Sequence, residues 1–200
     1  MQTLAARPRG LTLVEVAVST FVFSIAVAIA LTAGVNMNRA ATDGMQYSHI
    51  STIGSTVLDR LAEDIADADL NTITMPNPAG SQTVTFQRVT GYNQTTGSLT
   101  LSAAITYLWR IDPSELPNGL DDDGNGVIDE GQIVRNENGV DVILSDHIAF
   151  NGLTLVLTNG RGVEATVRPY YFATESGARV VRTGEFRTMI TARNGVNVGN

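Results

Sequence analysis

Oxygen-bearing side chains recur at alternate positions in one acidic stretch of this 200-residue sequence. From position 121 to 132 the stretch reads DDDGNGVIDEGQ, and its candidate metal ligands are Asp121, Asp123, Asn125, the backbone carbonyl of Val127, Asp129 and Glu130. Alternate residues can turn their oxygens toward one point, and Ca²⁺ prefers about six to eight oxygen ligands. Gly126 allows the sharp turn that such convergence requires. The stretch therefore predicts a structural calcium site, which would order the long connection between Ile111 and Gln132.

The same stretch resembles the calcium loop of EF-hand proteins, which supplies its ligands at fixed positions of a twelve-residue loop. At the twelfth position, where that family has a bidentate glutamate, this sequence has Gln132, and strand-like sequence flanks the loop. Glu130 or Asp122 could replace the missing carboxylate, with an expected dissociation constant of about 10⁻⁴–10⁻³ M. Ile128 is expected to anchor the loop to the core. The alternative is an acidic, glycine-rich surface turn that holds no metal.

A second candidate for chemistry is a single acid in a long apolar segment. Glu15 is the only charged residue between Leu11 and Leu31, a segment that would span one hydrocarbon core as a helix of about 31 Å. Arg7 and Arg9 precede the segment, so its N-terminal end is expected in the cytoplasm and the rest of the chain outside the inner membrane. A membrane-embedded carboxylate costs about 2.5–3.5 kcal/mol. It is therefore usually paired or functional, unless it lies near the headgroups and reaches water.

The sequence RGLTLVEV from Arg9 to Val16 resembles the cleavage motif of type IV prepilins. The resemblance implies that prepilin peptidase, a membrane aspartyl peptidase, removes the basic leader 1–10 by cutting between Gly10 and Leu11. Leu11 would then be N-methylated; the family most often has phenylalanine there, a similarly bulky apolar residue. Glu15 would lie about one helical turn from the new amine. We expect it to assist assembly by pairing with the amine of a neighbouring filament subunit, which would specify register.

A long helix must carry these N-terminal groups. The apolar segment 11–33 continues into an amphipathic segment 34–70, whose apolar residues recur every three or four positions. These residues are Ile50, Ile53, Val57, Leu61, Ile65 and Ala68. The charged residues between them, including Asp64, are assigned largely to the solvated side. The segment 71–80, with Pro76 and Pro78, is expected to end the helix.

The rest of the sequence, 71–200, predicts an exported β-rich domain. Its alternating apolar residues and turn signals indicate the strands Thr83–Thr90, Ser98–Leu101, Ile105–Ile111, Gln132–Arg135, Val140–Leu144, Leu153–Thr158, Gly162–Tyr170 and Val180–Ala192. The stretch Asn194–Asn200 is expected to be disordered. The predicted fold class is α+β and type IV pilin-like, with the long N-terminal helix packed on an antiparallel β-sheet.

Further residues are similar to one branch of the pilin-like proteins. LDRLAEDI at 58–65 is similar to the helix of J-type minor pseudopilins and the related W-type minor pilins, with shorter similarities at ITY (105–107), IVR (133–135) and VIL (142–144). The resemblance implies a minor subunit near the tip of a type II secretion pseudopilus. Its partners would be other minor and major pseudopilins and the inner-membrane assembly platform.

Two other functions remain open from the sequence. One is a minor pilin of a type IV pilus, serving assembly, adhesion or DNA uptake. The other is a single-pass anchored protein, either calcium-binding or enzymatic, that enters no filament.

Composition argues against several classes of function. The formal net charge is −7, and an acidic body does not favour binding nucleic acid through its phosphates. The absence of cysteine removes disulfides and thiolate chemistry. The only histidines are His49 and His147, and the adjacent residues of Ser145-Asp146-His147 point in different directions and do not form a triad unaided. We therefore expect no enzymatic activity.

Overall fold

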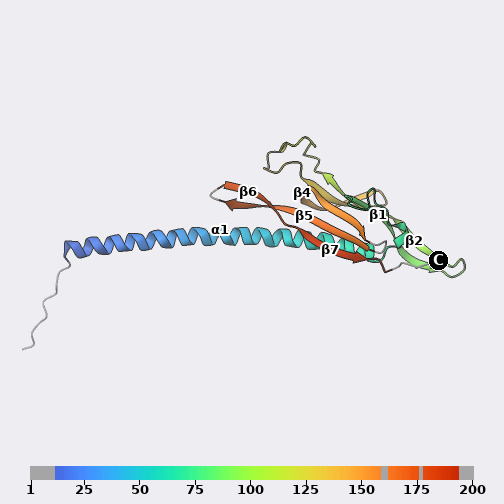
Figure 1. Cartoon of the computed structure of the whole chain (residues 1–200), viewed down its shortest axis with the longest axis horizontal. Helices are drawn as coiled ribbons and strands as arrows, with labels where there is room; N and C mark the ends of the chain where they lie inside the picture. The colour runs from blue at the N-terminus through green and yellow to red at the C-terminus, as the bar shows by residue number, and fades with distance from the viewer. Residues whose placement is uncertain (1–11, 159–161, 176–177, 194–200) are drawn as a thin grey trace, which may run out of the picture. The chain divides into compact units, whose positions relative to one another are not determined.

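The computed structural model describes residues 12–158, 162–175 and 178–193. These residues form a long helix, α1 (Leu13–Ala66), a short 3₁₀ helix, η1 (Leu70–Thr72), and a seven-stranded sheet (Figure 1). The chain divides into two compact units, one ending at Gly44 and the other beginning at Met45. Helix α1 contributes to both units.

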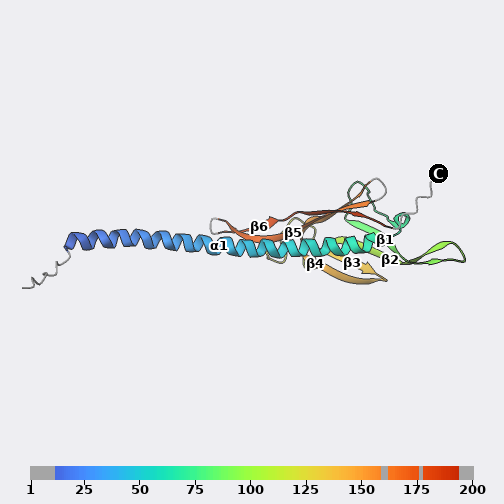
Figure 2. The same ribbon diagram turned by 90° about the horizontal axis from the view of Figure 1, so that it is seen from below.

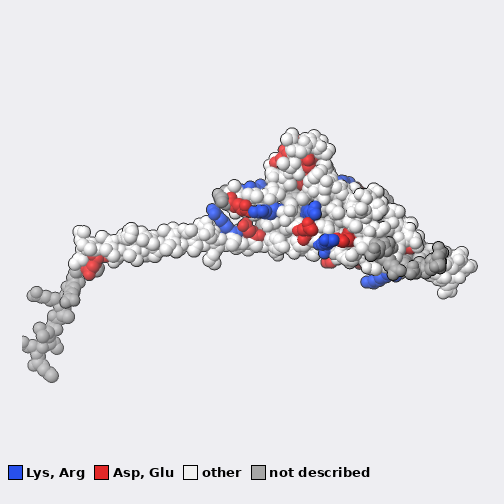
Figure 3. All heavy atoms as spheres, viewed as in Figure 1, with Lys and Arg blue, Asp and Glu red and all other residues white. Residues whose placement is uncertain are grey.

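The first unit contains the apolar part of α1. Near its N-terminus this helix has a window that is long and apolar enough to cross a membrane, and none of that window is buried within the chain. Large side chains such as Phe21, Phe23 and Ile29 are exposed, and the helix of this unit is almost free of charged side chains in Figure 3. Among the described residues this is the one helix with these properties, so it is the candidate membrane anchor.

The second unit contains the amphipathic part of α1, which lies along one face of the sheet in both views (Figures 1 and 2). The predicted apolar stripe is buried: Ile50, Val57, Leu61, Ile65 and Ala68 are at most 2 % exposed, while Ile53 is only half-buried. On the same face the ring of Phe186 lies so close to Gly54 that a side chain at Gly54 would overlap it. The helix therefore approaches the sheet closely.

Helix α1 ends at Ala66, earlier than the predicted end near residue 70. The residues that follow pair with the sheet, because Ala68 forms a β-bridge with Arg88 and the Asp69 N–H donates to the Gln87 carbonyl oxygen at 3.0 Å. The Asp69 carboxylate then caps η1. Pairing with a strand has thus replaced the last turn that the periodicity predicts.

The sheet is antiparallel throughout, with strand order β1-β2-β3-β4-β5-β6, and β7 also pairs with β5. Its strands are β1 (Thr83–Asn93), β2 (Ser98–Ile111), β3 (Gly131–Glu137), β4 (Val140–Thr158), β5 (Gly162–Glu175), β6 (Ala178–Thr183) and β7 (Phe186–Thr191). This arrangement confirms the predicted α+β class, with a long N-terminal helix packed on an antiparallel sheet.

Strand boundaries differ from the prediction where the backbone bulges. Two pairs of predicted strands merge into β2 and β4. In β4 the register shifts between Ile148 and Leu153, and Asn151 adopts a positive φ of 52°. Such a bulge interrupts the apolar alternation without ending the pairing. The last predicted strand is instead divided into β6 and β7 at Gly184, and the expected disorder of 194–200 lies outside the described residues.

Candidate functional site

The N-terminal processing site is only partly described. Gly10 and Leu11, the predicted cleavage pair, lie outside the described residues. Glu15 lies in the first turn of α1, where its carboxylate accepts hydrogen bonds from the Thr12 backbone N–H at 2.8 Å and the Thr12 hydroxyl at 2.9 Å. The Thr12 hydroxyl oxygen accepts in turn from the Glu15 N–H at 3.3 Å.

This exchange between Thr12 and Glu15 is a capping box, which satisfies N–H groups that a helix start leaves without partners. The sequence TLVE at 12–15 carries the signature of a capping box, so Glu15 has a local role that the resemblance to prepilins does not imply. The local role adds to the expected role in assembly and must be separated from it experimentally.

The acidic loop lies in the connection between β2 and β3 and is folded around Asp121. The carboxylate of Asp121 accepts hydrogen bonds from the N–H groups of Gly124 at 2.7 Å, Asn125 at 3.1 Å and Gly126 at 2.8 Å. Gly124 and Gly126 have φ values of 77° and 93°, which favour glycine, so the turn expected at Gly126 is present.

Three other polar residues of the predicted loop bind groups outside it. The Asp129 carboxylate accepts from the Gly119 N–H at 2.9 Å, and Asp122 accepts from the Leu116 N–H at 3.1 Å. The Gln132 amide donates to Asp112 at 2.7 Å. These residues therefore attach the loop to neighbouring segments.

The three carboxylates that do lie close together are those of Glu115, Asp123 and Glu130. One oxygen of each lies within 4.8 Å of the others. Glu115 is 4 % exposed and accepts from the Asp123 N–H at 3.0 Å, while Glu130 is 3 % exposed. Glu130 Oε1 accepts from the Asn125 amide, but Glu130 Oε2 is buried and has no hydrogen-bond partner among the described residues.

The electrostatics of this carboxylate cluster disfavour negative charge. Burial raises the pKa of Glu130, and the nearby carboxylates of Glu115 and Asp123 raise it further, although the Asn125 hydrogen bond lowers it. Asp123 and Glu130 were predicted as ligands, whereas Glu115 was not. Glu115 lies eight residues before Asp123 in irregular sequence, where no periodic pattern indicates it.

The apolar anchor of the loop is Val127, not Ile128 as expected. Val127 is 6 % exposed, while Ile128 is 54 % exposed. The Val127 N–H donates to the Asn125 side-chain oxygen at 2.7 Å, a local turn that directs Val127 inward. The expectation for Ile128 was wrong because it assumed EF-hand geometry over the whole loop.

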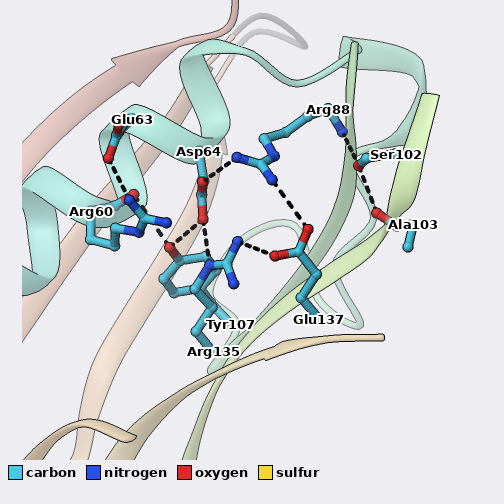
Figure 4. A network of polar contacts seen from close by, with 9 residues as sticks. All are labelled: Arg60, Glu63, Asp64, Arg88, Ser102, Ala103, Tyr107, Arg135 and Glu137. Atoms are coloured by element: carbon cyan, nitrogen blue, oxygen red, sulfur yellow. Dashed lines mark hydrogen bonds and ion pairs between the residues drawn. The ribbon is translucent and has the colours of Figure 1, made fainter. Parts of the chain in front are cut away.

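A second polar site lies between α1 and the sheet, around Asp64 (Figure 4). Asp64 was assigned to the solvated side, but the structure buries it completely. Its carboxylate accepts hydrogen bonds from the Tyr107 hydroxyl at 2.7 Å, Arg135 Nε at 2.6 Å and Arg88 Nη1 at 3.3 Å. The prediction failed because β1, β2 and β3 each supply a polar partner that compensates for the lost water.

Glu137, whose side chain is 26 % exposed, completes the network around the buried Asp64. It binds Arg135 at 2.7 Å and Arg88 at 3.1 Å, so two carboxylates face two guanidinium groups. The hydrogen bond from Arg135 lowers the pKa of Glu137. Burial, followed by the hydrogen bond to Asp64, raises the pKa of Tyr107. The network is therefore balanced in charge by residues of the chain itself.

The buried network also joins three of the four segments that carry the resemblance to J-type pseudopilins. Asp64 belongs to LDRLAEDI, Tyr107 to ITY and Arg135 to IVR. Tyr107 and Arg135 lie 43 and 71 residues from Asp64 in the sequence. Short similarities that are far apart in the chain thus contribute to a single structural feature.

The two histidines line one hollow of about 310 Å³ between α1 and strands β4 and β5. The His147 ring contacts Asp146 at 2.6 Å, and the Ser145 hydroxyl accepts from the His147 backbone N–H at 3.3 Å. The hydroxyl thus binds the backbone, an arrangement unlike a nucleophile activated by an imidazole. The expected lack of enzymatic activity stays a prediction.

Comparison of the chain with protein-family models, with curated proteins and with solved structures finds no match.

Proposed function

We propose that this chain is a pilin-like subunit of a membrane-anchored filament, resembling the J-type minor pseudopilins of type II secretion systems. In this proposal prepilin peptidase removes residues 1–10 and Leu11 is N-methylated. The apolar part of α1 holds the subunit in the inner membrane with its N-terminus in the cytoplasm. The subunit then assembles near the filament tip with other minor and major pseudopilins, on the inner-membrane platform.

The observation that carries the proposal is one helix with two different environments. The apolar window near the start of α1 has no burial within the chain, while the stripe from Ile50 to Ile65 is covered by the sheet. Exposed apolar surface of this extent requires lipid or neighbouring helices. A subunit that moves from a membrane into a filament core would have this surface covered first by lipid and then by neighbouring helices.

The buried Asp64 network supports the narrower assignment to a J-type subunit. Three of the segments that resemble this branch each supply one member of the network. This support is independent of the N-terminal cleavage motif.

Glu15 is the residue whose charge should matter for assembly. While a subunit is alone in the membrane, Thr12 can satisfy the Glu15 carboxylate within the same helix. Cleavage after Gly10 would create an amine one residue before Thr12. In a filament core, the amine of an adjoining subunit and Glu15 could neutralise each other in a low-dielectric setting, and this pairing would specify register.

The test combines mass spectrometry of the mature N-terminus with a substitution that keeps the helix cap. Glu15→Gln retains a capping side chain but removes the charge. We expect the variant to be cleaved and methylated at Leu11 like the wild type, yet to lose co-purification with its partner subunits. Glu15→Ala, which also removes the cap, should show the same assembly defect.

Two results would contradict the proposal. One is a functional assembly in which the chain still carries residues 1–10. The other is normal incorporation of Glu15→Gln, which would leave Glu15 with its capping role alone. Identification of the co-purified wild-type partners separates a pseudopilus from a type IV pilus, because the two contain different subunits.

A further inference from the structure

We propose that Glu115, Asp123 and Glu130 form a binding site for one divalent cation, Ca²⁺ being the best fit. This ligand set differs from the EF-hand spacing, because Glu115 lies outside the acidic loop and Asp129 is not a ligand. The inference goes beyond the filament function and does not depend on it.

The buried oxygen of Glu130 is the observation that points to a ligand. Glu130 is 3 % exposed, and its Oε2 has no hydrogen-bond partner among the described residues. A buried acceptor without a donor is unfavourable, and more so when it is charged. One Glu130 oxygen lies within 4.8 Å of an oxygen of Glu115 and of Asp123, so a cation between the three carboxylates would bind Glu130 and offset their mutual repulsion.

The spacing of the three oxygens suits calcium. No two of them are farther apart than 4.8 Å. Ligands on opposite sides of Ca²⁺ lie about 4.6–5.2 Å apart, since each Ca–O distance is about 2.3–2.6 Å. Mg²⁺ requires shorter distances and near-ideal octahedral geometry. The more flexible coordination of Ca²⁺ therefore makes it the better fit to three carboxylates in an irregular connection.

The neighbouring hydrogen bonds hold these carboxylates in place. Glu115 accepts from the N–H groups of Asp122 and Asp123, and the Asn125 amide binds both Asp123 and Glu130. Such contacts orient metal ligands before an ion binds. A bound cation would connect Glu115, near the start of the β2–β3 connection, to Glu130 at its end. The whole connection would become more rigid.

The structure also identifies a control residue within the same loop. Asp129 lies next to Glu130 in the sequence and was expected to bind the metal, but its carboxylate binds the Gly119 N–H. Asp129 has a φ of 50°, which asparagine tolerates well. Asp129→Asn can therefore keep both the backbone conformation and a hydrogen-bond acceptor.

The experiment is calorimetric titration of the full chain in detergent micelles with Ca²⁺ and, separately, with Mg²⁺. We expect the wild type to bind one Ca²⁺ with a dissociation constant of about 10⁻⁴–10⁻³ M and to bind Mg²⁺ more weakly. Glu115→Gln and Glu130→Gln should each weaken Ca²⁺ binding at least about tenfold. Asp129→Asn should stay within about threefold of the wild type, because only a nearby charge is lost.

Two results of the titration would overturn the inference: no binding by the wild type at about 10 mM Ca²⁺, or unchanged binding by Glu115→Gln. Loss of binding in Asp129→Asn with retention in Glu115→Gln would favour the EF-hand ligand set instead. If Glu115→Gln does not fold, wild-type thermal melting still decides. We expect calcium to raise Tm by about 3–6 °C over chelator, and equal midpoints would refute the site.

Discussion

Asp64 and Glu130 are two of the buried carboxylates of the second unit, and their surroundings are opposite in charge. Asp64 receives hydrogen bonds from two arginines and a tyrosine hydroxyl between α1 and the sheet. Glu130 lies beside two other carboxylates at the end of the β2–β3 connection and accepts a hydrogen bond from the Asn125 amide. Both carboxylates have lost contact with water, but only Asp64 has received positive charge in exchange.

The difference shows where this chain supplies its own counter-charge. At the contact of helix and sheet, three strands and the helix all contribute, so the buried Asp64 network is complete within one subunit. In the acidic loop, the proposed cation supplies the positive charge from outside the chain. Stability of the first region should then be independent of divalent ions, while order in the second should depend on them.

The largest expected effect comes from Asp64→Asn. The amide keeps the size of the side chain but leaves two arginines without the central carboxylate. We expect the free energy of unfolding to fall by about 3–5 kcal/mol, as when one partner of a buried ion pair is removed. Urea unfolding of the full chain in micelles, followed by the fluorescence of Trp109, the one tryptophan of the sequence, measures this change.

The matched control is Glu63→Gln, on the neighbouring residue of the same helix. Glu63 forms an exposed ion pair with Arg60. Its loss should change the free energy of unfolding by no more than about 0.5 kcal/mol. Similar effects of the two substitutions would mean that Asp64 does not depend on its buried partners.

The next largest expected effect is an increase in the free energy of unfolding, opposite in sign to that of Asp64→Asn. In the presence of chelator, Glu130→Gln removes a buried negative charge that the chain does not balance. We expect a gain of about 0.5–2 kcal/mol in the free energy of unfolding, comparable to other corrections of unfavourable charge. The same urea experiment with excess EDTA measures it. A loss of stability under these conditions would show that Glu130 is already satisfied without an ion.

The smallest expected effect is on the way the free energy of unfolding depends on pH. Arg135, and with it Arg88, lowers the pKa of Glu137 below its ordinary value of 4.5 in the folded state, and the carboxylate of Asp64 faces the same arginines. A lowered folded-state pKa contributes stability that is present above pH 4.5 and lost as the pH falls through the folded-state pKa. We expect Glu137→Gln to remove this part of the acid dependence, about 1 kcal/mol or less.

This prediction is tested by urea titrations of the wild type and Glu137→Gln at several pH values. The pH should run from about 6 to about 3, the range in which carboxylates titrate. The difference between the two proteins should shrink as the pH decreases, because the wild type loses its advantage. A constant difference would mean that Glu137 titrates alike in the folded and unfolded states.

Local patterns in the sequence predicted which helices and strands exist better than they predicted where each one ends. The three-and-four spacing from Ile50 to Ala68 predicted the buried face of α1, because helix periodicity is a property of neighbouring residues. The helix ended early because Ala68 and Asp69 pair with β1. Similarly, the bulge near Asn151 kept β4 continuous where the apolar alternation stopped.

The sequence by itself determined the apolar segment, the α+β class, and the acidic turn with its glycines. Each depends on residues within a few positions of one another. Only the tertiary structure decided that Asp64 is buried and that Glu115 joins the acidic loop. The partners of Asp64 are 24 to 71 residues away, and strand register brings them to it. Charge compensation over such distances leaves no periodic signal, so a buried acid and a solvated one look alike until the strands are placed.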